Sequence, residues 1–201
     1  MGSIGAVILA AGGSSRFGQP KQLIQFRGKS LVRRMVNGAG DAGCSPVIVV
    51  IGSDREQISR ELADASASIV ENENWQCGIG SSIRAGVRHL IGIAPNLEAI
   101  VLLVCDQPSV ESETVKRLIG LREETKKAIV ASSYADTLGV PALFDRSCFE
   151  ELLVLDDTSG AKPVILSNHD RVAEFPFPAG RIDIDTAADL ELARRAQRAS
   201  R

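Results

Sequence analysis

Short, uninterrupted apolar runs alternate with longer amphipathic segments along this chain. Such runs are typical of strands covered on both faces, and they occur at Ala6–Leu9, Val47–Ile51, Ile100–Val104 and Ala128–Ala131. The amphipathic segments have the period of surface helices, and they span Ser30–Gly40, Arg55–Ala63, Ser82–Ile91, Glu113–Glu124 and Thr186–Arg198. Strands that alternate with helices predict an α/β fold, with a mostly parallel sheet and helices on both sides.

Local signals mark the ends of several elements. Thr186 followed by Asp189 resembles a capping box and predicts the start of the last helix. Proline and glycine interrupt the pattern at Gly139-Val140-Pro141 and at Phe175-Pro176-Phe177-Pro178, which predicts loops or edge strands there. Neither an internal repeat nor a sharp change in composition divides the chain, so we expect residues 1–201 to form a single domain.

Composition and charge exclude several classes of function. The chain has 23 Lys and Arg against 25 Asp and Glu, a formal net charge of −2, which argues against a nonspecific nucleic-acid-binding protein. The apolar stretch Ile4–Ala11 is too short to span a bilayer. No secretory signal precedes the first strand, so we expect a cytoplasmic protein without membrane or nucleic-acid partners. The four cysteines form no CxxC pair and the chain has two histidines, which argues against a structural zinc site. Cys105 follows an apolar run and is expected to be buried.

The first predicted strand runs into a loop rich in glycine and serine. Its sequence is Leu9-Ala10-Ala11-Gly12-Gly13-Ser14-Ser15-Arg16-Phe17-Gly18-Gln19-Pro20-Lys21. Gln19 stands where a P-loop requires lysine, and the glycines miss the GxGxxG spacing of dinucleotide folds. Small residues still allow backbone N–H groups to approach an anion, and Arg16 and Lys21 can hold a triphosphate from two sides. The plainer alternative is a surface loop with incidental charges.

Acidic residues suggest a metal site at the same edge of the sheet. Asp106 follows a buried strand, where open α/β sheets bind ligands, and its carboxylate is a hard ligand suited to Mg²⁺. Asp183 and Asp185 would share a face if their segment is a strand, and either could join Asp106 on the metal. Alternatively, Asp185 only helps to start the following helix.

A third motif lies in Asn74–Ser82. Gly80-Ser81-Ser82 opens a predicted helix, so its N–H groups and hydroxyls can bind a base edge or an anion. An ordinary helix N-cap is the alternative.

Together these motifs resemble a known family. The segment from Leu9 to Lys21 resembles the LAAGxSxRMGxxK signature of nucleotidyltransferases with a glycosyltransferase-A-like fold. Further pieces follow in that family's order and point to its molybdenum cofactor cytidylyltransferase branch: Gly78-Ile79-Gly80-Ser81-Ser82, Asp106-Gln107-Pro108, Gly139-Val140-Pro141-Ala142-Leu143-Phe144 and Asp183-Ile184-Asp185-Thr186.

The resemblance implies a three-layer α/β/α sandwich and a Mg²⁺-dependent transfer of CMP from CTP to the terminal phosphate of molybdenum-molybdopterin. A recipient molybdenum hydroxylase is an implied partner. Ala11 favours CTP, because guanylyl-transferring relatives usually carry LAGG. The implied catalytic residues are Arg16, Lys21 and Asp106; the implied metal ligands are Asp106, Asp183 and Asp185; and the implied nucleotide-binding residues are Leu9, Ala10, Ala11, Gly12, Gly13, Ser14, Lys21, Gly80, Ser81 and Ser82.

This sequence departs from the family pattern mainly where the acceptor is expected. Phe17 replaces the usual Met, Val140 stands where His is common, and Lys162 replaces Arg in the segment that resembles GDxGAR. Two alternatives therefore remain: a nucleotidyltransferase that acts on a sugar or polyol phosphate, and a non-enzymatic carrier or chaperone of the molybdenum cofactor.

Overall fold

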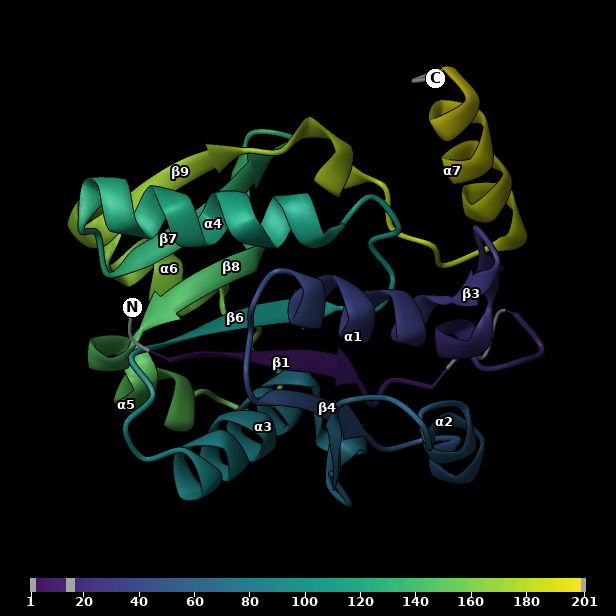
Figure 1. The fold of residues 1–201 in the computed structure, drawn as a ribbon, viewed down its shortest axis with the longest axis horizontal. Helices are drawn as coiled ribbons and strands as arrows, with labels where there is room; N and C mark the ends of the chain where they lie inside the picture. Colours follow the sequence, from purple (N-terminus) through teal and green to yellow (C-terminus); the bar gives the residue numbers. More distant parts are fainter. Residues whose placement is uncertain (1–2, 14–16, 200–201) are drawn as a thin grey trace.

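The computed structural model describes residues 3–13 and 17–199 and is built on one seven-stranded sheet (Figure 1). The strand order is β5-β4-β1-β6-β8-β7-β9. Within the described residues β8 alone runs against its neighbours β6 and β7, whereas the other pairs are parallel. The strands are β1 (Ile4–Ala10), β4 (Val47–Ile51), β5 (Ser68–Glu71), β6 (Ala99–Val104), β7 (Ile129–Tyr134), β8 (Thr137–Asp145) and β9 (Val172–Pro176); β2 (Gln25–Phe26) and β3 (Lys29–Ser30) form a separate ribbon.

Helices cover both faces of the sheet, so the predicted α/β fold with a mostly parallel sheet is confirmed. One core contains side chains from α1 (Leu31–Asp41), α2 (Arg55–Glu61) and α4 (Ser112–Thr125). The opposite core contains side chains from α3 (Ile79–Ile93), α5 (Phe149–Leu153) and α6 (Lys162–Ser167). Figure 1 shows α1 and α4 on one side of the sheet and α3 on the other.

The period of two along a strand explains why these strands are apolar throughout. In β1, Ala6 and Ile8 face the first core, whereas Val7 and Leu9 face the second. A strand buried on both faces has no position for a solvated side chain. The same division holds for β4 and β6, which flank β1.

The last helix, α7 (Ala187–Ala199), packs away from the sheet against a small third cluster with Ile24, Phe26 and Ile184. Its predicted capping box is confirmed, since the Thr186 N–H donates to Asp189 Oδ2 at 2.7 Å and the Asp189 N–H donates to Thr186 Oγ1 at 3.3 Å. Short 3₁₀ turns complete the chain at η1 (Lys21–Leu23), η2 (Trp75–Cys77), η3 (Arg146–Cys148), η4 (His169–Arg171) and η5 (Pro178–Arg181).

One local prediction is wrong, and one condition on which another depended is not met. Gly139-Val140-Pro141 lies inside β8, an interior strand, and not in a loop or edge strand. Proline is tolerated there because the register between β7 and β8 shifts at this point: Ala131 pairs with Ala142, and Ser132 pairs with Gly139. The segment of Asp183 and Asp185 is irregular chain after η5, not a strand.

The remaining expectations concern cysteines and membrane spans. Cys105 is buried as predicted, and the four cysteines are free thiols. Within residues 3–13 and 17–199, no helix combines the length and apolar character needed to cross a bilayer.

Candidate active site

The predicted motifs meet at the carboxyl end of the parallel strands. β1 and β6 are paired from Ile4↔Ala99 to Leu9↔Val104, so the loop after Leu9 and the side chain of Asp106 leave the sheet at the same edge. A cavity of about 350 Å³ opens there. It is lined by Leu9, Ala10, Ala11, Gly12, Lys21, Gln22, Trp75, Gln76, Gly78, Ile79, Ser82, Val104, Cys105 and Asp106.

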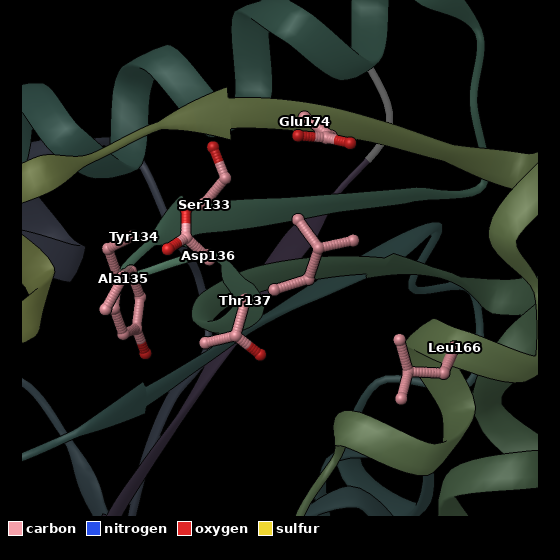
Figure 2. A pocket seen from close by; sticks show the side chains of 8 residues that line it. Ser133, Tyr134, Ala135, Asp136, Thr137, Leu166 and Glu174 are labelled. Atoms are coloured by element: carbon pink, nitrogen blue, oxygen red, sulfur yellow. The ribbon is translucent and has the colours of Figure 1, made fainter.

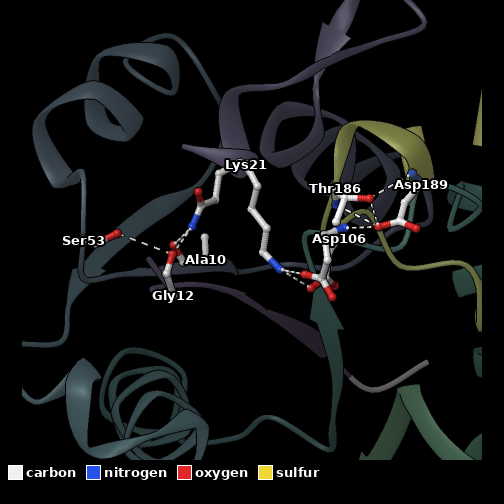
Figure 3. A network of polar contacts seen from close by, with 9 residues as sticks. Ala10, Gly12, Lys21, Ser53, Asp106, Thr186 and Asp189 are labelled. Atoms are coloured by element: carbon white, nitrogen blue, oxygen red, sulfur yellow. Dashed lines mark hydrogen bonds and ion pairs between the residues drawn. The ribbon is translucent and has the colours of Figure 1, made fainter. Parts of the chain in front are cut away.

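Lys21 joins two of the predicted carboxylates. The turn η1 presents its Nζ at 2.6 Å from Asp106 Oδ2 and at 2.9 Å from Asp185 Oδ1; Figure 3 shows the lysine reaching Asp106. Burial by itself would lower the pKa of Lys21, but the two carboxylates outweigh it and raise this pKa above its usual value. The ammonium therefore stays charged and holds residues from distant parts of the chain together.

The negative charges of Asp106 and Asp185 also act on the carboxyl of Asp183. Burial, followed by the charges of Asp106 and Asp185, raises the pKa of the Asp183 carboxyl to about 6, although Gln107 and Lys21 offset part of the effect. Among the described residues, no group of three or more acidic, histidine or cysteine side chains is close enough to hold a metal ion. Asp106 and Asp185 nevertheless converge on one cation already, the Lys21 ammonium. Two carboxylates fit Mg²⁺, which is usually held by one or two of them together with water and substrate phosphates.

The raised pKa of Asp183 predicts a pH-dependent stability. Its value of about 6 in the folded protein, against 3.8 for an ordinary carboxyl, means that the folded state binds more protons between these two values. The free energy of unfolding should therefore fall as the pH rises through this window. Above the window, the protein should remain less stable by the full amount of this decrease. Because Asp183 is only partly buried, water weakens this effect, and we expect Asp183→Asn to raise the free energy of unfolding above this window by at most about 1 kcal/mol and to flatten the profile.

Urea titrations at several pH values without divalent ions would measure this effect. Glu150→Gln, at an exposed position of α5, is the matched control and should keep the wild-type profile. A slope that persists in Asp183→Asn would contradict the assignment.

A buried residue that the sequence analysis did not single out, Gln22, holds the start of the candidate phosphate-binding loop in place. The Gln22 side chain is 1 % exposed, and its Nε2 donates to the carbonyl oxygens of Ala10 and Gly12 at 2.8 and 2.7 Å. Ser53 also contacts the Gly12 carbonyl oxygen, at 3.4 Å (Figure 3). A Cβ at Gly13 would lie 3.4 Å from the Trp75 ring. Arg16 and Ser14 lie outside the described residues. A glutamine directly after Lys21 was the only signal for this role.

Gly80-Ser81-Ser82 lies in the first turns of α3, which begins at Ile79. Of these three residues, only Ser82 lines the cavity. The Ser81 hydroxyl is hydrogen-bonded to the Gly78 carbonyl oxygen at 2.7 Å, and Asn72 Nδ2 donates to both serine hydroxyls, at 2.8 Å to Ser81 and 3.0 Å to Ser82. The hydroxyl of Ser81 is thus engaged within the protein, but the serines do not cap the helix, because the N-cap of α3 is Gly78 and no side chain makes a cap hydrogen bond there.

The start of α3 is also packed tightly against a loop from the second half of the chain. The Gly80 N–H donates to the Asp157 carbonyl oxygen at 2.8 Å, and a Cβ at Gly80 would lie 2.0 Å from the Asp156 carbonyl oxygen. Arg84 of α3 bonds to Asp157 as well. Close approach therefore requires glycine at position 80.

Gly80→Ala should displace this loop and lower the free energy of unfolding by about 1–3 kcal/mol, as measured by urea denaturation. Gly92→Ala in the same helix is the matched control, because a Cβ there meets nothing within 4 Å. The control should be neutral or should stabilise the protein by up to about 1 kcal/mol. Equal stability of the two variants would contradict the close packing.

Gln107 is a second residue whose role the sequence did not reveal. It is 3 % exposed, and its Nε2 donates to the carbonyl oxygens of Gly180 and Val140 at 3.0 and 3.2 Å. The Ile184 N–H donates to the Asp106 carbonyl oxygen at 2.8 Å. These bonds hold the chain that carries Asp183 and Asp185 beside Asp106.

A separate hollow of about 630 Å³ lies by the β7–β8 turn (Figure 2). Leu166 and Glu174 border it together with Ser133, Tyr134 and residues of the turn. It contains none of the predicted site residues. Tyr134 connects it to the active-site edge, since its hydroxyl lies 3.3 Å from Gln107 Nε2.

Solved structures share this fold. Rv0371c from Mycobacterium tuberculosis H37Rv is 29% identical with a TM-score of 0.81, and the match covers 96% of this chain and 98% of that one. The same protein has been solved in complex with manganese. A nucleotidyl transferase from Methanothermobacter thermautotroptrophicus, 22% identical over 98% of this chain and 99% of its own, has a TM-score of 0.78. The fold is therefore the glycosyltransferase-A-like fold of nucleotidyltransferases.

Sequence relatives carry different names. The nicotine blue oxidoreductase of Paenarthrobacter nicotinovorans is 29% identical over 80% of this chain and 74% of its own length. A probable molybdenum cofactor guanylyltransferase of Bacillus cytotoxicus is 26% identical over 65% of this chain and 62% of its own length. The profile of the MobA-like NTP transferase domain matches residues 6–172. The chain therefore belongs to the MobA-like NTP transferase family of nucleotidyltransferases.

Proposed function

We propose that this protein transfers CMP from CTP to the terminal phosphate of molybdenum-molybdopterin and releases pyrophosphate. The observation that carries the proposal is the arrangement of Lys21, Asp106 and Asp185 beside a cavity walled by Leu9–Gly12. A cation and two carboxylates at the rim of such a cavity suit a nucleoside triphosphate with its divalent ion. The named molybdenum cofactor guanylyltransferase among the relatives supports a molybdopterin-type acceptor.

Ala11 supports CTP as the nucleotide. Its side chain is buried and lines the cavity, and the double alanine of the loop resembles the cytidylyl-transferring branch. Ser82 and Trp75 also line the cavity and are the side chains that we propose to contact the nucleoside. Arg16 and Ser14 are proposed to bind the β- and γ-phosphates from the loop.

The chemistry that we propose is an in-line displacement at the α-phosphorus. A phosphate oxygen of the acceptor forms the new P–O bond as the bond to pyrophosphate breaks. That oxygen is already anionic near neutral pH, so no strong general base is needed. Lys21 stabilises the charge that develops around the α-phosphorus. Asp106 and Asp185 would hold Mg²⁺, which supplies charge neutralisation when bound; the manganese complex of Rv0371c supports a divalent ion in this fold.

The acceptor is proposed to enter beside Val140 and Lys162, where the sequence departs from the family. The Val140 carbonyl oxygen accepts hydrogen bonds from Gln107 and Tyr134, and Gln107 directly follows Asp106 in the chain, which supports an entry on this side. A recipient molybdenum hydroxylase would then accept the finished cofactor.

The first experiment measures pyrophosphate release with Mg²⁺ from CTP and from GTP, with and without molybdenum-molybdopterin. CTP-selective release that requires the pterin is the expected result. Asp106→Asn serves as the control for contaminating pyrophosphatase or transferase activity. Release with GTP instead would overturn the role of Ala11. Release that requires a sugar or polyol phosphate would overturn the acceptor, and tight pterin binding without any release would indicate a carrier.

A further inference from the structure

Lys21 occupies the position between two carboxylates where a divalent ion would lie. Its Nζ is 2.6 Å from Asp106 Oδ2 and 2.9 Å from Asp185 Oδ1. Asp106 follows β6 and Asp185 precedes α7, and their side chains meet through this ammonium. The side chains of Lys21 and Asp106 are about one-fifth exposed, whereas that of Asp185 is about half exposed, so water screens the pair with Asp106 less than the pair with Asp185.

We propose that Lys21 is the internal counter-ion of the metal site: it holds Asp106 and Asp185 together before the metal arrives, and the metal and the ammonium then compete for the same carboxylates. The inference rests on the proposed function and adds to it the order in which the nucleotide and the divalent ion bind. The divalent ion binds weakly to the free protein and tightly once the phosphates of the nucleotide attract Lys21 away from the carboxylates.

The physical argument is one of charge. A Mg²⁺ ion needs carboxylate oxygens at about 2.0–2.1 Å, so an ion shared by Asp106 and Asp185 would lie within a few ångströms of the present ammonium. Two cations that close repel each other strongly. The four-carbon stem of lysine allows the ammonium to move while its charge is conserved. The triphosphate provides a new anionic partner for it at the neighbouring loop.

This competition makes a thermodynamic prediction. If the nucleotide removes a competitor, the nucleotide and the metal each raise the affinity of the other by the same factor. Removing the ammonium by mutation should give part of that gain without nucleotide. We expect Lys21→Met to bind Mn²⁺ about tenfold more tightly than the wild type, within the range of 5–150-fold typical of such coupling, and to gain correspondingly less from nucleotide.

The test is a Mn²⁺ titration followed by electron paramagnetic resonance at mildly alkaline pH, with and without a non-hydrolysable α,β-methylene analogue of CTP. Lys29→Met, on the exposed side of β3, is the matched control and should behave as the wild type. Lys21→Gln is the second neutral variant, and thermal melts verify that each variant is folded. The inference is overturned if folded Lys21→Met and Lys21→Gln bind Mn²⁺ no more tightly than the wild type.

A measurement on the wild-type protein covers the case in which neither variant folds. Trace acetylation with acetic anhydride, read by mass spectrometry, should increase at Lys21 relative to Lys29 when Mn²⁺ is bound. Unchanged Lys21 acetylation at saturating Mn²⁺ would overturn the inference.

The two proposals fail in different ways. Absence of Mn²⁺ binding to the wild type even with the CTP analogue would refute the metal site of the proposed function, and the counter-ion role with it. Mn²⁺ binding that is weakened by Asp185→Asn but not strengthened by Lys21→Met would overturn the counter-ion role alone.

Discussion

Asp106→Asn should reduce the rate of the proposed CMP transfer by about three orders of magnitude or more. The substitution keeps the shape of the side chain but removes one of the two negative charges that converge on Lys21. Charge stabilisation worth several kcal/mol would be lost in the transition state, and each 1.36 kcal/mol corresponds to about a factor of ten in rate. Steady-state pyrophosphate release at saturating CTP and Mg²⁺ measures the effect.

Glu150→Gln is the matched control for Asp106→Asn, because it also replaces a carboxylate by an amide, at an exposed position of α5. It should retain wild-type turnover. A folded Asp106→Asn protein with near wild-type turnover would refute the placement of the catalytic centre at this edge of the sheet.

Lys21→Ala should lower kcat by about 10²–10³ while the KM for CTP changes much less. That range is typical for the removal of one preorganised donor that acts on charge developing in the transition state. A mutation that lowers kcat and kcat/KM together has removed an interaction made mainly in the transition state. Full Michaelis–Menten curves for CTP, with the acceptor saturating, separate the two constants.

A rise in KM with unchanged kcat would instead confine the role of Lys21 to binding the phosphates in the ground state. The double variant Asp106→Asn/Lys21→Ala adds a sharper test. The two side chains are in direct contact, so their effects on turnover should be less than additive. Strict additivity would show that they act independently.

Sequence patterns could predict the sheet because the information was local. β1, β4 and β6 are buried on both faces, so each appears as an uninterrupted apolar run. β5 is only half-buried and was missed, since its short, mixed sequence has no such run. The short helices α5 and α6 were missed as well; they have too few turns for a helical period to emerge.

The interior position of β8 shows how a local rule can fail. Proline normally excludes a central strand because it cannot donate to the ladder. In β8, Pro141 lies where the pairing register with β7 shifts. Its carbonyl oxygen accepts a hydrogen bond from Ser132 at 2.6 Å. The shifted pairing with β7 and the hydrogen bond from Ser132 make proline acceptable in this interior strand. The residues around position 141 give no sign of either feature.

The candidate site, like the sheet, could be predicted from the sequence only in part. The sequence by itself determined that the loop after Leu9 and the side chain of Asp106 lie at one edge, because parallel strands end on the same side of a sheet. It also indicated Lys21, Asp183 and Asp185 as charged groups available to that edge. Only the tertiary structure decided that Lys21 bridges Asp106 and Asp185 and that buried Gln22 and Gln107 fix the loop and the acidic segment. The physical reason is that strand and helix periods are properties of neighbouring residues, whereas these contacts join segments far apart in the chain and exist only after both have folded onto the sheet.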